Sequence, residues 1–305
     1  MDNRKSLLQD ISDFAELGRI KEINKAGGIA NDNYFVTTNK GEYFIKINLE
    51  NYDFNDKLQE QAYLERLQQH DFPAVSYYRS PTGDFIYQKN DVLALIQEKV
   101  DATSPNKLTK NIVNQIGFFL AELHKIPFNP VPNKKSWMRS NYLADAIPVL
   151  ENNYSDNKYV RELIQLYKAL NFKADSLPQS LIHGDCFPDN TLFKNEKFIA
   201  FIDWEDVCVG ASLVEFALAV IAFCFKDNSF QVDLYNELHT NYKKNKPFTK
   251  DEEEKVEEAV RYVALTIAVW RFLYHNYYHP DEKFKNRFQS FWKQGLDKWE
   301  KPRSA

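Results

Sequence analysis

The sequence has few cysteines, no excess of positive charge and no long apolar segment. Its three cysteines, an odd number without a C-x-x-C spacing, argue against a disulfide framework or a zinc site and favour a reducing cytoplasm. A formal net charge of −4 gives no electrostatic footprint for nucleic acid. The longest apolar run, residues 216–225, is too short to cross a bilayer, and residues 1–14 lack the apolar core of a signal peptide. No nucleic-acid or membrane partner is therefore predicted.

The composition is that of a folded protein with a sizeable core. Of its 305 residues, 44% are hydrophobic and 27% are charged, and this length is enough for two lobes. Apolar side chains recur at helical spacing in residues 1–18. An amphipathic helix is predicted at 55–70, and strands are predicted at 20–25, 33–38, 42–48, 74–80, 85–90 and 91–100. The turn-prone TNKG and PTGD predict two hairpins, so residues 1–100 should form a small, mostly antiparallel sheet with one inserted helix.

The later part of the chain has apolar stripes at helical spacing. Helices are predicted at 109–125, 141–151, 157–171, 212–225, 251–278 and in the last residues, with a hairpin within 191–203 and irregular chain at 127–135. The lysines at 243, 244 and 246 are interpreted as part of a solvated loop. The predicted fold class is therefore α+β and bilobal, with a β-rich nucleotide-binding lobe at 1–100 and a larger helical lobe at 101–305.

The stretch LIHGDCFPDN, residues 181–190, places two carboxylates, a carboxamide and an imidazole between apolar neighbours. Because unpaired buried charge is costly, this is either a solvated turn or a site. Asp185, in a turn after a short strand, can accept a proton from a substrate hydroxyl, whereas His183 is interpreted as a structural hydrogen-bonding residue. Asn190 and Asp203 offer oxygen ligands for Mg²⁺, which bridges nucleotide phosphates in phosphoryl transfer. The predicted cofactors are therefore ATP and Mg²⁺.

The spacing D-x-x-x-x-N resembles the catalytic loop of protein kinases, which also need a strand lysine for the phosphates and a helix glutamate that holds it. Lys46, in the alternating strand EYFIKI, is the candidate lysine, although a surface strand lysine is the plain alternative. Glu60 is its candidate partner, with Glu65 as the competitor. The other residues predicted to bind the nucleotide are Gly28 and Asn31 in the turn before the lysine strand, and Glu98 and Val100 at the strand end that meets adenine.

The patterns H-G-D-x-x-x-x-N and I-D-W-E resemble those of the aminoglycoside phosphotransferase and choline kinase superfamily of small-molecule kinases. Within it, HGDCFPDNTLF and IDWEDVCVGASLVEFALAVIAFCF are most similar to the type II homoserine kinases. The resemblance runs from GGIANDNYFV to the final helices. It implies ATP-dependent phosphorylation of a small hydroxyl compound, homoserine or a related amino acid or amino alcohol, by a monomer or homodimer.

Two residues are predicted to contact that acceptor, Glu205 and Arg271. Arg271 matches an arginine of the late R-F-x-x-x-R-L pattern of the homoserine kinases, but Thr266 stands where the first arginine belongs. If an arginine pair holds a substrate carboxylate, this change puts homoserine itself in doubt. The plain alternative for Arg271 is a helix-surface residue or a structural ion pair.

Two other acceptor classes, and a role without catalysis, compete with the interpretation as a homoserine kinase-like enzyme. A choline site needs an aromatic cage, which Trp204, Trp270, Tyr274 and Tyr277 can supply unless they are core residues. An aminoglycoside site needs acids, and Glu205, Asp206 and the run 251–254 are available, although that run also fits a helix amino terminus. A kinase-like binding protein without activity is the rival from another class, and the intact Asp185, Asn190, Asp203 and Lys46 argue against it.

Overall fold

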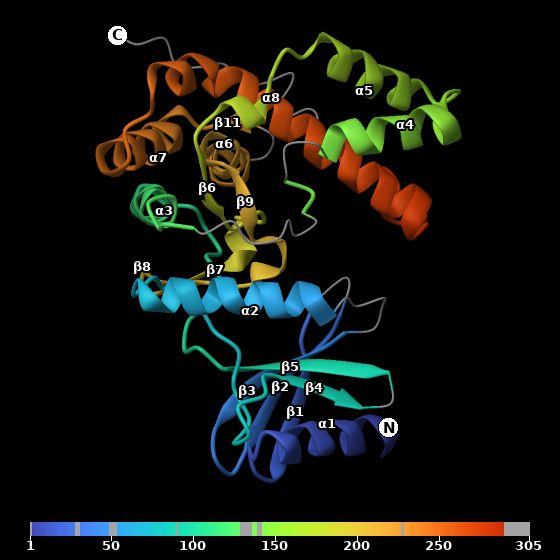
Figure 1. Cartoon of the computed structure of the whole chain (residues 1–305), viewed down its shortest axis with the longest axis vertical. Helices are drawn as coiled ribbons and strands as arrows, with labels where there is room; N and C mark the ends of the chain where they lie inside the picture. The colour runs from blue at the N-terminus through green and yellow to red at the C-terminus, as the bar shows by residue number, and fades with distance from the viewer. Residues whose placement is uncertain are drawn as a thin grey trace. The chain divides into compact units, whose positions relative to one another are not determined.

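The computed structural model describes residues 2–27, 31–48, 54–89, 91–128, 136–138, 142–226 and 229–289. By its internal contacts the chain divides into two compact units, Met1–Ala102 and Thr103–Ala305. Each unit has its own architecture, and the predicted α+β class is confirmed: a five-stranded antiparallel sheet in the first unit is followed by a mostly helical second unit (Figure 1).

The first unit is a five-stranded sheet in the order β1-β2-β3-β5-β4, with every neighbouring pair antiparallel. The helices α1 and α2 lie on opposite sides of this sheet (Figure 1). The elements are α1 (Asp2–Phe14), β1 (Ile20–Lys25), β2 (Asn31–Thr38), β3 (Glu42–Asn48), α2 (Phe54–Gln69), β4 (Ile86–Lys89) and β5 (Val92–Glu98).

Alternation along β3 decides which of its side chains enter the main core of the first unit. Tyr43, Ile45 and Ile47 are buried in one cluster with Leu8 and Ile11 of α1. Successive strand side chains point to opposite faces, so Lys46 belongs to the other face of the sheet. Its ladder partner there is Leu95, which belongs to a second cluster with Phe85, Ile86 and Leu93.

The prediction of a hairpin between residues 74–80 and 85–90 is wrong. Residues 75–80 are not a strand, and β4 pairs with β5 instead. The register gives the reason. β4 occupies the edge of β5 from Val92 to Leu95, so residues 74–80 meet that edge only farther along, where the Tyr78 N–H donates to the Ile96 carbonyl at 2.7 Å.

The second unit packs its helices around α6, whose residues are buried at nearly every position. α6 packs on α8, and α3 packs along α7. The helices of this unit are α3 (Lys110–Leu123), α4 (Tyr142–Tyr154), α5 (Lys158–Ala169), α6 (Ser212–Phe223), α7 (Val232–Asn245) and α8 (Lys250–Leu273). A π-helical turn, Tyr274–Tyr278, continues α8. Most of the predicted irregular segment 127–135 and of the last residues lies outside the described residues.

The interpretation of the lysine cluster as a loop is wrong for two of its three members. Lys243 and Lys244 lie in the last turn of α7, and only Lys246 follows the helix. The helix forms because Tyr235, Leu238 and Tyr242 recur at helical spacing and are all buried. Basic side chains at the carboxyl end of a helix also interact favourably with its dipole.

Short antiparallel strand pairs carry the loops of the second unit. They are β6 (Gln179–Ile182) with β9 (Cys208–Ala211), β7 (Thr191–Lys194) with β8 (Lys197–Phe201), and β10 (Phe225–Lys226) with β11 (Ser229–Phe230). The hairpin predicted within 191–203 is thus confirmed as β7–β8. Its turn residues, Asn195 and Glu196, both have positive φ, as type I′ hairpin turns require.

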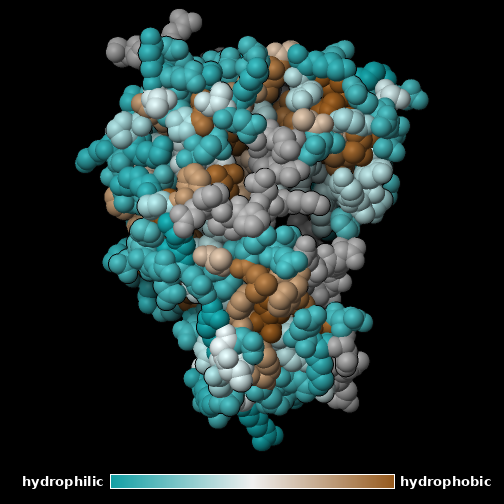
Figure 2. Space-filling view, viewed as in Figure 1, coloured by the Kyte–Doolittle hydropathy of each residue, from teal (hydrophilic) through white to brown (hydrophobic). Residues whose placement is uncertain are grey.

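The helices, the surface and the cysteines of the described residues bear on the expectations from composition. None of the helices there has the length and apolar character needed to cross a membrane. Hydrophilic residues cover most of the face shown in Figure 2, and Phe54 and Leu58, one turn apart on α2, are among the exposed large hydrophobic side chains. Cys186, Cys208 and Cys224 are all free and buried.

Candidate active site

The loop after β6 holds Asp185 through backbone geometry that only a glycine accommodates. Gly184 has a φ of +82°, and a Cβ atom there would lie 2.3 Å from the carbonyl oxygen of Asp206. The imidazole of His183 is completely buried. Its Nδ1 accepts from the Asp185 N–H at 3.2 Å, so its Nε2 donates to the Ile202 carbonyl at 2.9 Å. His183 therefore orients the loop, as predicted for a structural hydrogen-bonding residue.

Asp185 and Asn190 are brought together, although five positions separate them. The Asn190 side chain donates from Nδ2 to the Asp185 carboxylate at 2.7 Å and to the Asp185 carbonyl at 2.9 Å. The short 3-10 turn Pro188–Asn190 reverses the chain, so that the Asn190 side chain can reach Asp185. Because Nδ2 is committed to Asp185, Oδ1 is the atom with which Asn190 would meet a cation.

A buried network behind this loop was missed by the sequence reasoning. Glu215, in the first turn of α6, has no exposed surface. It accepts from the Gly184 N–H at 2.8 Å and contacts His124 Nε2 at 2.8 Å, while His124 Nδ1 contacts the Tyr242 hydroxyl at 2.7 Å. If Glu215 is ionised, one set of donors satisfies all three contacts: Tyr242 O–H to His124 Nδ1, and His124 Nε2–H to Glu215. A lone acid in an otherwise apolar helix was the signal in the sequence.

Asp203 follows β8 and lies beside Asn190 because of the β7–β8 hairpin. Thr191 pairs with Phe201, and the Ile202 N–H donates to the Asn190 carbonyl at 3.0 Å. Asp203 itself is exposed and has the left-handed φ of 63°. The hairpin thus delivers the two predicted metal ligands to the same end of its two strands.

The charges around Asp185 are mostly negative. Burial raises the pKa of the Asp185 carboxyl well above its usual range, and the charges of Asp206, Asp203 and Asp189 raise this pKa further. The hydrogen bond from Asn190 lowers it. A raised pKa is the direction that makes a carboxylate a better proton acceptor at neutral pH.

The donor set fits Mg²⁺ more than a softer metal. Asp203 and Asn190 both offer oxygen, the ligand type that Mg²⁺ prefers, and the crowding of acids near Asp185 is the charge distribution that a cation relieves. Within the described residues, no group of three or more His, Cys, Asp or Glu side chains is placed to hold a metal. Two protein ligands are in keeping with a metal that retains waters and binds substrate phosphates.

In the first unit, Glu60 of α2 is a fully buried carboxylate with several partners. Lys57 Nζ lies 2.5 Å from it, and the Tyr77 hydroxyl also donates to it. Tyr77 packs against the cluster that contains Leu95, the ladder partner of Lys46, so Lys46 and Glu60 share one face of the sheet. The side chain of Glu65, the competitor, is by contrast 46% exposed and pairs with Arg79.

The other predicted nucleotide residues lie at the ends of strands. Asn31 begins β2, Glu98 ends β5 opposite Tyr43, and the Val100 carbonyl accepts from the Ala102 N–H at 2.9 Å. Gly28 lies outside the described residues. Their roles in binding a nucleotide remain predictions.

Arg271 of α8 is affected by the charges of the loop that holds Asp185. Burial lowers the pKa of its guanidinium to about 10, Arg287 lowers this pKa as well, and Asp185 and Asp189 raise it. Arg271 therefore stays cationic at neutral pH, with a second arginine near it that the sequence reasoning did not single out. Glu205 is half-buried in the 3-10 turn Trp204–Asp206.

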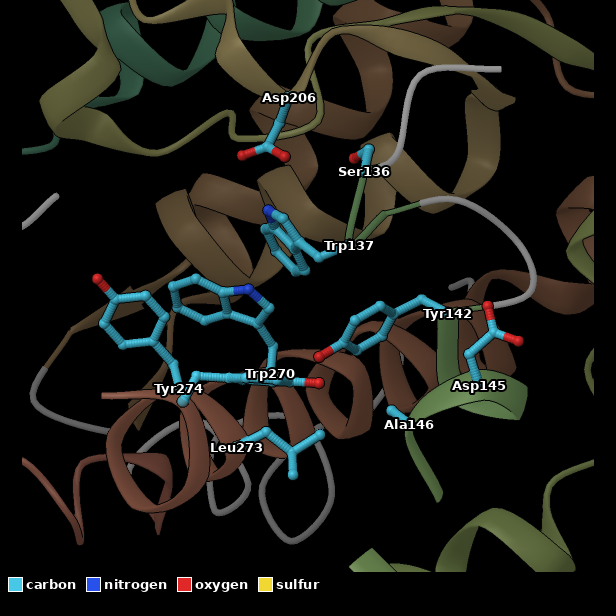
Figure 3. Close-up of a pocket in the computed structure, with 10 residues that line it drawn as sticks. Ser136, Trp137, Tyr142, Asp145, Ala146, Asp206, Trp270, Leu273 and Tyr274 are labelled. Carbon is cyan, nitrogen blue, oxygen red and sulfur yellow. The ribbon is translucent and has the colours of Figure 1, made fainter. Parts of the chain in front are cut away.

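A cavity of about 410 Å³ opens in the second unit. Trp137, Trp270, Tyr274 and Asp206 are among its lining residues, and in Figure 3 the two indole rings lie close together with the Asp206 carboxylate beyond Trp137. Of the four aromatic residues considered for a choline cage, Trp270 and Tyr274 line this cavity. Trp204 is instead a core residue packed on His183 and Phe201, and Tyr277 is not among the lining residues.

Residues 21–248 match the model of the phosphotransferase enzyme family (APH). The chain belongs to this family. The match includes β1 apart from its first residue, β2 to β5, the loop with Asp185 and the whole β7–β8 hairpin. The resemblance inferred from H-G-D-x-x-x-x-N and I-D-W-E is therefore confirmed at the level of the family.

Relatives within the family include bacterial homoserine kinases. The homoserine kinase of Caulobacter vibrioides is 26% identical over 270 residues, which cover 80% of this chain and 80% of that protein. The homoserine kinase of Hyphomonas neptunium is 25% identical over 219 residues, and there the chain spans 64% of the relative.

A solved structure of similar fold is that of amicoumacin kinase hAmiN in complex with AMP-PNP, Ca²⁺ and Ami. It matches with a TM-score of 0.75 at 14% identity and covers 96% of this chain and 93% of that one. At this identity the likeness establishes the fold, and that protein was solved with a nucleotide analogue bound.

Proposed function

We propose that the protein transfers the γ-phosphoryl group of ATP to a hydroxyl of a small molecule, with homoserine or a related amino acid or amino alcohol as the acceptor class. The observation that carries the proposal is the arrangement of Asp185, Asn190 and Asp203 at one end of the β7–β8 hairpin. Family membership and homoserine kinase relatives over most of the chain support it.

Asp185 is the proposed general base. Its carboxylate accepts the proton of the acceptor hydroxyl as the hydroxyl oxygen attacks the γ-phosphorus and the bond to the bridging oxygen of ADP breaks. Asn190 holds the Asp185 carboxylate through the 2.7 Å hydrogen bond, and His183 holds the Asp185 peptide. The backbone and the side chain of Asp185 are thus both fixed. This lowers the entropy cost of orienting the carboxylate toward the acceptor hydroxyl.

Asn190 and Asp203 are the proposed ligands of Mg²⁺, which supplies neutralisation of the charge on the phosphates. In the first unit, Lys46 is the proposed contact to the α- and β-phosphates, with Glu60 as the residue that positions it. The burial of Glu60 favours it over Glu65, because the ion pairs of a solvent-exposed carboxylate are screened by water and hold a lysine only weakly. We further propose that the protein works in the reducing cytoplasm as a monomer or a homodimer.

The decisive experiment measures ADP release with purified full-length protein over homoserine, hydroxylated amino acids, choline, ethanolamine and aminoglycosides. Asp185→Asn should lower kcat by about 10²–10⁴-fold and leave the affinity for ATP nearly unchanged, because the base lies away from the phosphates. Asp203→Ala should instead weaken Mg²⁺-dependent ATP binding in calorimetry. Asp175→Asn is a matched control, since Asp175 belongs to the separate 3-10 turn Ala174–Ser176.

Two outcomes would count against the proposal. ATP binding without turnover of any acceptor would favour the rival function, a kinase-like binding protein without activity. Wild-type turnover in Asp185→Asn would remove Asp185 as the base and leave the reaction to another residue.

A further inference from the structure

The first unit buries a lysine that the proposed reaction does not use. Lys57 lies near the start of α2 and is 3% exposed, whereas Lys46 of β3, the proposed phosphate contact, is only half-buried. Lysine is almost never buried this completely unless it is paired. Lys57 therefore needs a charged partner, and its presence in the interior needs an explanation.

The partner of Lys57 is the carboxylate of Glu60, one turn later on the same helix. The ammonium nitrogen of Lys57 lies 2.5 Å from Oε2 of Glu60, and the two side chains are 4% and 0% exposed. The Tyr77 hydroxyl donates to Oε1 of the same carboxylate. An ionised carboxylate has about four acceptor positions, so Glu60 can accept from Lys46 in addition to these two partners.

These groups lie on the face of the sheet that carries Lys46. The ring of Tyr77 stacks on that of Phe85, with the centroids 6.0 Å apart. Phe85 belongs to the cluster that contains the ladder partner of Lys46. Because Tyr77 and Lys57 both contact Glu60, two lysines and one carboxylate share this face.

Stability alone is a weak reason for burying such a pair. Moving an ammonium group and a carboxylate out of water is costly, and exchanging a buried ion pair for apolar residues is often neutral or stabilising. A buried carboxylate also favours its neutral form unless a cation compensates its charge. A neutral acid at position 60 could not hold a lysine as an ion pair.

The balance of charge gives a stronger reason. With Lys46 and Lys57 protonated and Glu60 ionised, two ammonium groups face one carboxylate, and one positive charge is left over. If Lys46 were the only cation for Glu60, the two charges would cancel. Little attraction would then remain for the negative phosphates of a nucleotide.

We propose that Lys57 is a positioning residue for phosphate recognition, which acts through Glu60. Lys57 compensates the carboxylate, so that Glu60 orients Lys46 while the Lys46 ammonium keeps its charge for the α- and β-phosphates. This inference rests on the proposed phosphotransferase function and adds a second lysine to it. The role requires no contact between Lys57 and the nucleotide.

The test separates the phosphates from the rest of the nucleotide. Binding of ATP and of adenosine to the full-length protein in the presence of Mg²⁺ is measured by calorimetry, so that neither an acceptor nor turnover is needed. Lys57→Met should weaken ATP binding by about tenfold or more, because the net positive charge beside the phosphates is lost. Adenosine has no phosphates, so its binding should change by less than about twofold.

Two more variants and a control distinguish charge from packing. Lys57→Gln, which still donates a hydrogen bond but carries no charge, should weaken ATP binding as Lys57→Met does. Adding Glu60→Gln to Lys57→Met removes the uncompensated carboxylate, so most of the lost ATP affinity should return. Lys89→Met is the matched control, because Lys89 pairs with Asp10 in the same unit at 2.9 Å but both side chains are exposed, at 56% and 45%.

The outcomes separate this inference from the proposed function. ATP binding unchanged in Lys57→Met and Lys57→Gln, an equal loss for ATP and adenosine, or a double variant as weak as Lys57→Met would overturn the role of Lys57. Any of these results in a protein that phosphorylates an acceptor would leave the proposed function standing. Selective loss of ATP affinity and its recovery in the double variant, in a protein that phosphorylates no acceptor, would support the role of Lys57 and remove the proposed function. A wild-type protein that binds no ATP would overturn both.

Discussion

Removal of the buried Glu215 carboxylate should destabilise the second unit and misplace the catalytic loop. In Glu215→Ala the Gly184 N–H and His124 Nε2 each lose a partner that now lies at 2.8 Å. Leaving a buried donor without its acceptor costs about 1–3 kcal/mol. With two such donors, the expected loss in the free energy of unfolding is about 2–6 kcal/mol.

Glu215→Gln should have a smaller effect. The glutamine Oε1 can still accept from Gly184, and His124 can switch tautomer so that Nδ1–H donates to the Tyr242 hydroxyl, which also accepts. About 1–2 kcal/mol is expected, because the bond to His124 loses its charge. Both variants should also lower kcat by about tenfold or more, because small misplacements of reacting groups are costly.

The loss of stability is measured by urea unfolding followed by tryptophan fluorescence. This signal reports on the second unit, since all five tryptophans follow residue 103. Glu254→Ala is the control. The side chain of Glu254 in α8 is 65% exposed, and its Oε1 lies 3.8 Å from Lys250 Nζ. Its removal should change the free energy of unfolding by less than about 0.5 kcal/mol. A Glu215→Ala protein as stable as Glu254→Ala would refute the reasoning about the network.

Three further results are expected. Lys46→Met should lower kcat/KM strongly and Glu60→Gln more mildly in steady-state assays, and a silent Glu60→Gln would contradict the proposed pairing. Arg271→Leu should raise the KM for an acceptor that carries a carboxylate while leaving the KM for ATP and for choline unchanged; an equal rise for choline would exclude this role. Asp206→Asn removes a negative charge that raises the pKa of Asp185. The acidic limb of the plot of kcat/KM against pH should therefore move to lower pH, and an unmoved limb would mean that another group titrates.

The hairpin β7–β8 and most regular elements were predictable because their signals are local. Strands β1 and β3 were predicted with the bounds that the structure has, since apolar and polar residues alternate there and turn residues flank them. Asp185 and Asn190 were singled out by their spacing of five residues, whereas the hydrogen bond between them was seen only in the structure. Such features depend on the neighbouring sequence and need no knowledge of tertiary packing.

What escaped prediction depends on contacts between distant segments. His124, Glu215 and Tyr242 come from three helices, and nothing in their separate neighbourhoods fixes their distances. Residues 74–80 have the composition of a strand, but competition with β4 for the edge of β5 decides their structure. Arg287 was overlooked for the same reason, because its proximity to Arg271 arises from the fold after α8.

The candidate catalytic and metal-binding residues are separated in the sequence from most residues that line the aromatic cavity. This separation has a consequence for how the specificity of such a protein can evolve. His183, Asp185, Asn190 and Asp203 all lie within residues 179–211, and of the described lining residues only Asp206 comes from that segment. Under the proposed function, substitutions in α4, in α8 or in the π-helical turn would alter this cavity and leave the residues proposed for phosphoryl transfer unchanged. We therefore expect directed evolution toward a new acceptor to accumulate changes at positions 137, 142, 270, 274 and 278 rather than within 179–211.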